Sequence, residues 1–192
     1  MDVLTAIKTR RSIGLVKQEP VPKEMIETLL EAATWAPCHH RTEPWRFFVM
    51  TGEGRNALSD TFVKMAKAKM EEPLSEEDQK KLEKEKNKPL RAPVVIAVAV
   101  KPAEDNPKVV LEEEFAAGHA AVQNLLLAAH SLGLGAVWRT GAVCSAPEIR
   151  ELFHLQGKAE IIGFVYVGYP DLKKDPVAKR KPVSDVTQWM DK

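Results

Sequence analysis

The segment EAATWAPCHHRTEPWRFFVM, residues 31–50, joins a helix to a strand through a short loop. Apolar side chains recur at helical spacing over 23–35, and Pro37 favours an end of the helix just beyond them. Arg46–Thr51 is short, aromatic and β-branched, which is typical of a buried strand. Between the helix and the strand lie Cys38, His39, His40 and Arg41. These loop residues have three interpretations: a thiol nucleophile, a metal site, or one side of a binding site for a flat aromatic ligand.

The rest of the chain alternates helical and strand patterns and predicts an α+β fold. Asp2 is expected to cap the first helix, and Ser145–Glu148 has the spacing of a capping box for a late helix. Gly133 is expected to end a long helix that is rich in alanine. The patterns predict helices over 2–10, 112–132 and 148–153, and strands over 93–100, 135–140 and 159–168.

Two segments contribute little to the expected core. Residues 75–88, SEEDQKKLEKEKNK, carry many charges and are interpreted as a solvated helix or a mobile lid rather than an interaction surface. The tail over 170–189 is basic and interrupted by prolines, so it needs another surface to lie on.

Composition limits the classes of function. The 192 residues, 44% of them hydrophobic, fit a single domain over 1–192. A formal charge of +1, from 28 basic and 27 acidic side chains, gives no field that recruits nucleic acid or an anionic membrane. Two cysteines, no apolar leader and no apolar run near the length of a bilayer span predict a cytoplasmic protein with a small-molecule partner.

The spacing of the loop residues argues against both a catalytic thiol and a metal site. Cys38 and His39 are adjacent, but adjacent side chains point apart in extended backbone, so a buried or pocket-lining thiol is favoured over a nucleophile. The loop histidines and the distant His119 and His130 do not have the spacing of zinc ligands, so no metal is predicted.

Two basic clusters suggest a site for a phosphate. Arg10-Arg11-Ser12 follows the first helix, and Trp138-Arg139-Thr140 ends a strand. Guanidinium and hydroxyl groups together are suited to gripping a phosphate. With Trp35 and His39 on the loop they predict a site that has a phosphate end and a flat, apolar end. The glycines at 133–135 follow a helix and precede a strand, the reverse of the Rossmann order, so a Rossmann fold is not expected.

These motifs, in this order, resemble the flavin-dependent nitroreductase family, and most closely its small bacterial subgroup with a WR[ST]G turn. The resemblance covers nearly the whole chain, and its most specific part is EAATWAP followed by EPWRFFV. RRSI near the start, RAPVVIAVAV and GLGAVWRTG carry the rest of it.

The resemblance implies an α+β fold with a mixed, mostly antiparallel central sheet between helices, completed by homodimerisation. It also implies one FMN in each of two sites shared across the dimer interface. In such a site the flavin carries the chemistry, so no catalytic side chain is expected. The expected FMN-binding residues are Arg10, Arg11, Ser12, Trp138, Arg139 and Thr140 of one subunit with Trp35 and His39 of the other.

The implied activity is transfer of two electrons from NAD(P)H to a nitroaromatic, a quinone or another small aromatic acceptor by a ping-pong mechanism. A protein that stores or senses FMN without turnover is the alternative, and a cysteine hydrolase using Cys38 is a third. Four residues differ from those frequent in the wider family, namely Gly14, Cys38, Arg41 and Glu43.

Overall fold

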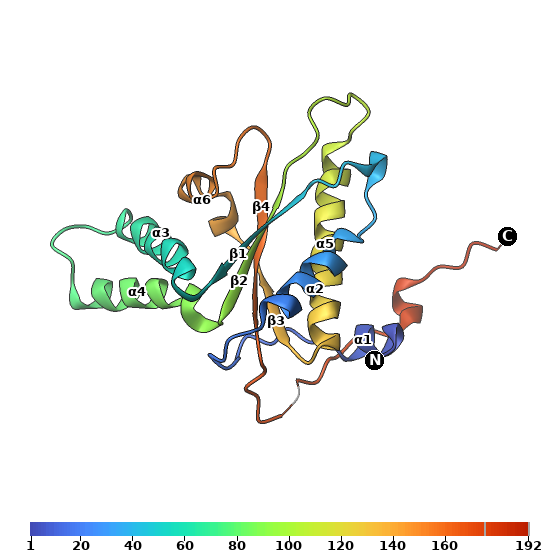
Figure 1. Ribbon diagram of the computed structural model, residues 1–192, viewed down its shortest axis with the longest axis horizontal. Helices are drawn as coiled ribbons and strands as arrows, with labels where there is room; N and C mark the ends of the chain where they lie inside the picture. The colour runs from blue at the N-terminus through green and yellow to red at the C-terminus, as the bar shows by residue number, and fades with distance from the viewer. Residues whose placement is uncertain (175, 192) are drawn as a thin grey trace.

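The sheet at the centre of the protein has four strands, each paired antiparallel with its neighbours (Figure 1). A computed structural model describes residues 1–174 and 176–191. The spatial order of the strands is β1-β2-β4-β3. Their bounds are Trp45–Thr51 for β1, Val94–Val100 for β2, Gly135–Arg139 for β3 and Glu160–Gly168 for β4.

The central strands explain the uninterrupted apolar runs of the sequence. Every residue of β2 is buried, because helices cover both faces of the sheet. In β4, Ile162 has no partner in the β2 register, since Val98 pairs with Gly163 and Ala99 with Ile161. This extra residue forms a β-bulge next to the end of β3.

Helices form a layer on each face of the sheet (Figure 1). The first core cluster packs α2 (Lys23–Thr34) and α5 (Leu111–Ser131) against one face. The second packs α3 (Asn56–Lys67) and α6 (Pro147–Leu152) against the other. The remaining long helix, α4 (Glu76–Asn87), lies outside α3 and buries none of its residues.

The N-terminus lies near the C-terminal end of α5, and part of the C-terminal tail passes close to it (Figure 1). There, α1 (Val3–Thr9) is tied to α5 by a 2.7 Å hydrogen bond between Thr9 Oγ1 and His130 Nε2. The segment after α1 then runs beside β3, where Ser12 bridges Ala136 in parallel. The C-terminal tail passes α1 and ends away from the sheet.

Most predicted elements are confirmed, and of the four predicted helix ends, those at Asp2, Pro37 and Gly133 are confirmed. Asp2 accepts a hydrogen bond from Thr5 N at 3.0 Å, and Gly133 takes a φ of 76° directly after the end of α5. The charged segment 75–88 is a solvated helix with a capping box that the sequence analysis missed.

The capping box predicted at Ser145 is wrong. Ser145 belongs to the 3-10 turn Ala142–Ser145, and its side chain makes no capping bond to α6. Pro147 is the first residue of α6 and fixes the helix start there, so Ala146 is the N-cap. Within 1–174 and 176–191, no helix is long and apolar enough to cross a bilayer.

Candidate functional site

Three arginines gather where the N-terminal segment meets the C-terminal tail. Arg11 donates to the carbonyl oxygens of Lys8 at 2.7 Å and Pro176 at 3.1 Å, which joins the two segments. The pKa of Arg10 is lowered, mainly because burial disfavours its charge and further because Arg11 and Arg180 repel it. No carboxylate among the described residues forms an ion pair with this arginine cluster, which consists of Arg10, Arg11 and Arg180.

The other predicted cluster, at the end of β3, is divided between the two faces of the sheet. Trp138 points toward α5, with its indole N–H donating to the Ile162 carbonyl at 3.2 Å and its ring centroid 5.6 Å from that of His119. Arg139 points to the opposite face, where its guanidinium carbon lies 5.6 Å from the centre of the Tyr166 ring. A strand places successive side chains on opposite faces, so these neighbours cannot act on the same side.

Gly14 lies beside Arg139. A Cβ at this position would stand 3.4 Å from Arg139 Nη2, so the N-terminal segment passes close to that side chain. The structure therefore brings the Arg10-Arg11-Ser12 turn to the flank of the same strand that carries Arg139 and Thr140.

A cavity of about 1220 Å³ opens on the Arg139 side of the sheet. Arg139 and Thr140 line it, together with Tyr166 and Arg91. Burial raises the pKa of Tyr166, and the positive charges of Arg139 and Arg91 oppose that rise. Both guanidinium groups are therefore close enough to stabilise negative charge at the same end of the cavity.

The walls of this cavity differ in character. Phe62, Met65 and Phe164 give it an apolar side. A second part of the lining, the charged wall, is a row at helical spacing along α4 and its C-cap residue, formed by Asp78, Lys81, Glu85 and Lys88. A flat, largely apolar molecule with polar edges fits such a lining.

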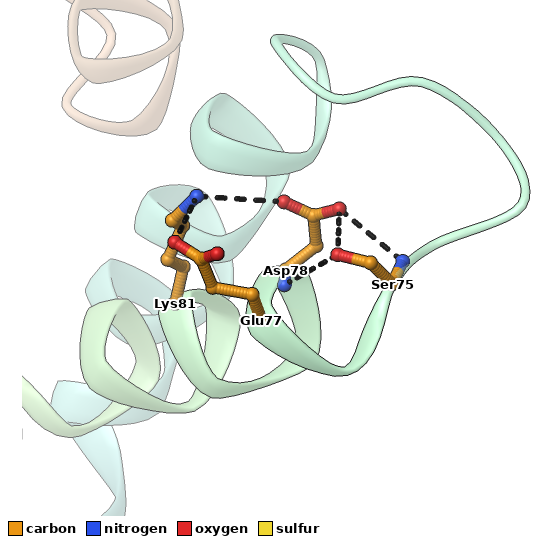
Figure 2. A network of polar contacts seen from close by, with 4 residues as sticks. All are labelled: Ser75, Glu77, Asp78 and Lys81. Carbon is orange, nitrogen blue, oxygen red and sulfur yellow. Dashed lines mark hydrogen bonds and ion pairs between the residues drawn. The ribbon is translucent and has the colours of Figure 1, made fainter.

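The start of α4 is fixed by a capping box (Figure 2). Ser75 Oγ accepts from the Asp78 backbone N–H at 3.1 Å, and Asp78 Oδ2 accepts from Ser75 N at 3.2 Å. The hydrogen bonds from Ser75 lower the pKa of Asp78, while the hydrogen bond and charge of Glu77 raise that of Lys81. Two residues of the charged wall, Asp78 and Lys81, are thus held at the capped end of their helix.

Trp35 and His39 do not line the cavity of their own chain. Trp35 is 80% exposed and borders a shallow pocket between α1 and α5. His39 lies in the loop, with Nδ1 2.9 Å from Glu113 Oε2 and its ring stacked on that of His40. One chain alone therefore leaves these two predicted site residues apart from Arg139 and Thr140.

Three residues near the predicted site were missed from the sequence. Arg180 belongs to the basic run KRK in the tail, which was the one available signal. Arg91 and Tyr166 line the same cavity as Arg139 only because of the strand order, and nothing in their local sequence marks them.

The loop shows neither a metal cluster nor an engaged thiol. Cys38 packs against the first core cluster, while the imidazole of His39 is engaged by Glu113 and His40. Among the residues that the structure describes, no group of three or more His, Cys, Asp or Glu side chains could hold a metal ion.

Comparison with known sequences gives one consistent result. A model of the Nitroreductase family matches residues 7–169. A protein of Escherichia coli (strain K12) named "Putative NAD(P)H nitroreductase YdjA" is 37% identical over 174 residues, which are 90% of this chain and 91% of that protein.

Solved structures agree with the sequence matches. A nitroreductase-like family protein from Bacillus cereus has a TM-score of 0.83 and 30% identity, over 100% of this chain and 97% of that one. A Desulfovibrio desulfuricans protein, described as a "putative nitroreductase in complex with fmn", has a TM-score of 0.72 and 27% identity, over 97% and 95% of the two chains. The α+β, nitroreductase-like fold predicted from the sequence is confirmed.

Proposed function

The chain belongs to the nitroreductase family, and from this we propose that it is an FMN-dependent oxidoreductase that passes two electrons from NAD(P)H to flat aromatic acceptors. The observation that carries the proposal is the pairing of two features: an arginine cluster that forms no ion pair with a carboxylate of residues 1–174 and 176–191, and a cavity that is lined by Arg139 and Thr140. The unpaired thiols fit the cytoplasmic location expected from the sequence.

The residues present fit an FMN phosphate at the arginine cluster. Arg11 and Arg180 both repel the charge of Arg10, and a dianion would relieve that repulsion while accepting hydrogen bonds from the guanidinium groups. Ser12, which is exposed next to the cluster, adds a hydroxyl donor.

The cavity fits the ring end of the same cofactor. FMN, when bound, supplies a ring that takes a hydride from a nicotinamide and passes two electrons on. Arg91 and Arg139 would favour negative charge at the polar edge of a bound ring. The apolar side formed by Phe62, Met65 and Phe164 would exclude water and orient a flat acceptor.

The test is the absorbance spectrum of the purified protein followed by steady-state kinetics. We expect one FMN per chain and NAD(P)H oxidation that depends on a quinone or nitroaromatic acceptor. One flat slot for both substrates predicts ping-pong kinetics with parallel double-reciprocal lines. Protein that takes up no added FMN would refute the proposal, while bound FMN without acceptor-dependent turnover would favour the storage alternative.

We expect a homodimer in solution, because the surface around α1 is too apolar to face water. Val3, Leu4 and Trp35 are 70%, 66% and 80% exposed, and in the tail Trp189 is 84% exposed. A second copy covering this surface would also bring Trp35 and His39 toward the other subunit's flavin. Light scattering should give twice the mass of 21.4 kDa, and a monomer at micromolar concentration would contradict the prediction.

Cys38→Ala is expected to keep the bound flavin and most of the turnover. The thiol packs against the core as a small apolar group, so its loss leaves a minor cavity and removes no reacting group. The measurement is kcat and FMN content, with Cys144→Ala as the second-thiol control. A hundredfold loss of kcat with FMN retained would instead support a reacting thiol.

A further inference from the structure

The loop that carries His39, residues 38–43, has a strained backbone. His40, Arg41 and Glu43 have φ values of 56°, 54° and 45°, a region that L-residues with side chains rarely adopt. Such a backbone conformation is unfavourable for a residue with a side chain and persists only where surrounding contacts hold it. The first turn of α5 supplies those contacts at two points.

The first contact is a buried carboxylate. Glu114 is 1% exposed, and its Oε1 accepts a hydrogen bond from Thr42 Oγ1 at 2.5 Å. Its Oε2 accepts from the Ala103 backbone N–H at 3.0 Å. A carboxylate this deeply buried is tolerated because both oxygens are satisfied, so it fixes Thr42 firmly relative to the start of α5.

The second contact is on the surface, one residue earlier. Glu113 Oε2 lies 2.9 Å from His39 Nδ1. With Nδ1 engaged, the tautomer and orientation of the imidazole are set and Nε2 is the nitrogen left for a ligand. Adjacent acidic residues thus hold both the backbone of the loop and the ring that it carries.

We propose that Glu113 and Glu114 are positioning residues for the flavin site: Glu114 holds the strained loop 38–43 through Thr42, and Glu113 aims the His39 ring. The role rests on the proposed function, in which His39 reaches the flavin bound by a second copy of the chain. It extends the site to a helix turn that lines no part of the cavity in its own chain.

The proposal is tested by FMN titration of flavin-free variants, followed by flavin fluorescence. Glu113→Gln should weaken FMN binding about 2–5-fold, which is the effect expected from losing an exposed ion pair. Glu114→Gln should weaken FMN binding about 10-fold, which is the effect expected from losing a hydrogen bond to a charged group. Glu112→Gln, an exposed neighbour on the same turn, is the matched control and should bind as wild type does.

A double-mutant cycle separates positioning from general stability. In a His39→Ala background, Glu113→Gln should have no further effect on FMN affinity, because its only described partner is gone. An equal loss in both backgrounds, or no loss with His39 present, would overturn the role of Glu113.

A second readout does not depend on flavin. Trypsin cleavage after the exposed Arg41 should be about 10-fold faster in flavin-free Glu114→Gln and Thr42→Val than in wild type, while Thr42→Ser keeps the hydroxyl and should restore protection. Unchanged cleavage in Glu114→Gln and Thr42→Val would overturn the role of Glu114. Wild-type protein that binds no FMN would refute the proposed function and the flavin role with it, whereas normal FMN binding in both glutamate variants would refute the positioning role alone.

Discussion

Replacing Gly163 by alanine is expected to lower the free energy of unfolding of the flavin-free protein by about 3 kcal/mol or more, from overpacking together with an unfavourable φ. A Cβ at this position would lie 2.0 Å from Trp138 Nε1 and 2.8 Å from the Arg139 carbonyl oxygen. The indole cannot simply swing away, because its N–H bonds to the Ile162 carbonyl within the β-bulge. The added methyl group would press against backbone on one side and against the hydrogen-bonded indole ring on the other. Neither group can move aside without a loss of stability.

Urea denaturation measures the loss, and two other glycines provide controls. A Cβ on Gly54 would meet nothing within 4 Å, so Gly54→Ala should change the free energy of unfolding little. Gly141 has a φ of 114° and equally open space, so Gly141→Ala isolates the backbone strain. If Gly163→Ala lowers the free energy of unfolding no more than Gly141→Ala does, the packing of Trp138 against the bulge is not the reason that position 163 requires glycine.

Local patterns predicted the elements well, because each depends on neighbouring residues. The run at 93–100 indicated a strand buried on both faces, and β2 is buried throughout. Gly133 indicated the end of α5 and has the positive φ that a helix end often needs.

The errors have equally local causes. Ser145 has capping-box spacing, but Pro147 requires the helix to begin one residue later than that box allows. Ser75 and Asp78 were overlooked because the charges around them suggested only solvation.

The site could be predicted only in part, because it depends on strand order. The turn Arg10-Arg11-Ser12 reaches β3 through a bridge that no sequence pattern marks. Tyr166 meets Arg139 because β4 pairs with β3, and Arg180 meets Arg10 because the tail returns past α1. The roles of the predicted flavin residues remain predictions that substitution can test.

Arg10→Met is expected to weaken FMN binding by about 10- to 100-fold. This is the effect of losing a charged hydrogen-bond donor that contributes about 1.5–3 kcal/mol to binding. The same change should preserve or raise the stability of the flavin-free protein. Folding lowers the pKa of Arg10, so the charged form is less favourable in the folded chain than in the unfolded one at every pH below that pKa. The charge of Arg10 therefore destabilises the folded, flavin-free protein. Methionine removes this charge and keeps a side chain with a similar apolar stem.

Opposite changes in affinity and stability are what distinguish a ligand-binding arginine from a structural one. FMN titration and urea denaturation of the flavin-free protein measure the two quantities on the same sample. Lys80→Met, which removes an exposed positive charge on α4 away from the cavity lining, is the control and should change neither. If Arg10→Met loses stability in the flavin-free protein and binds FMN as wild type does, Arg10 serves the fold, and the arginine cluster is not the phosphate site.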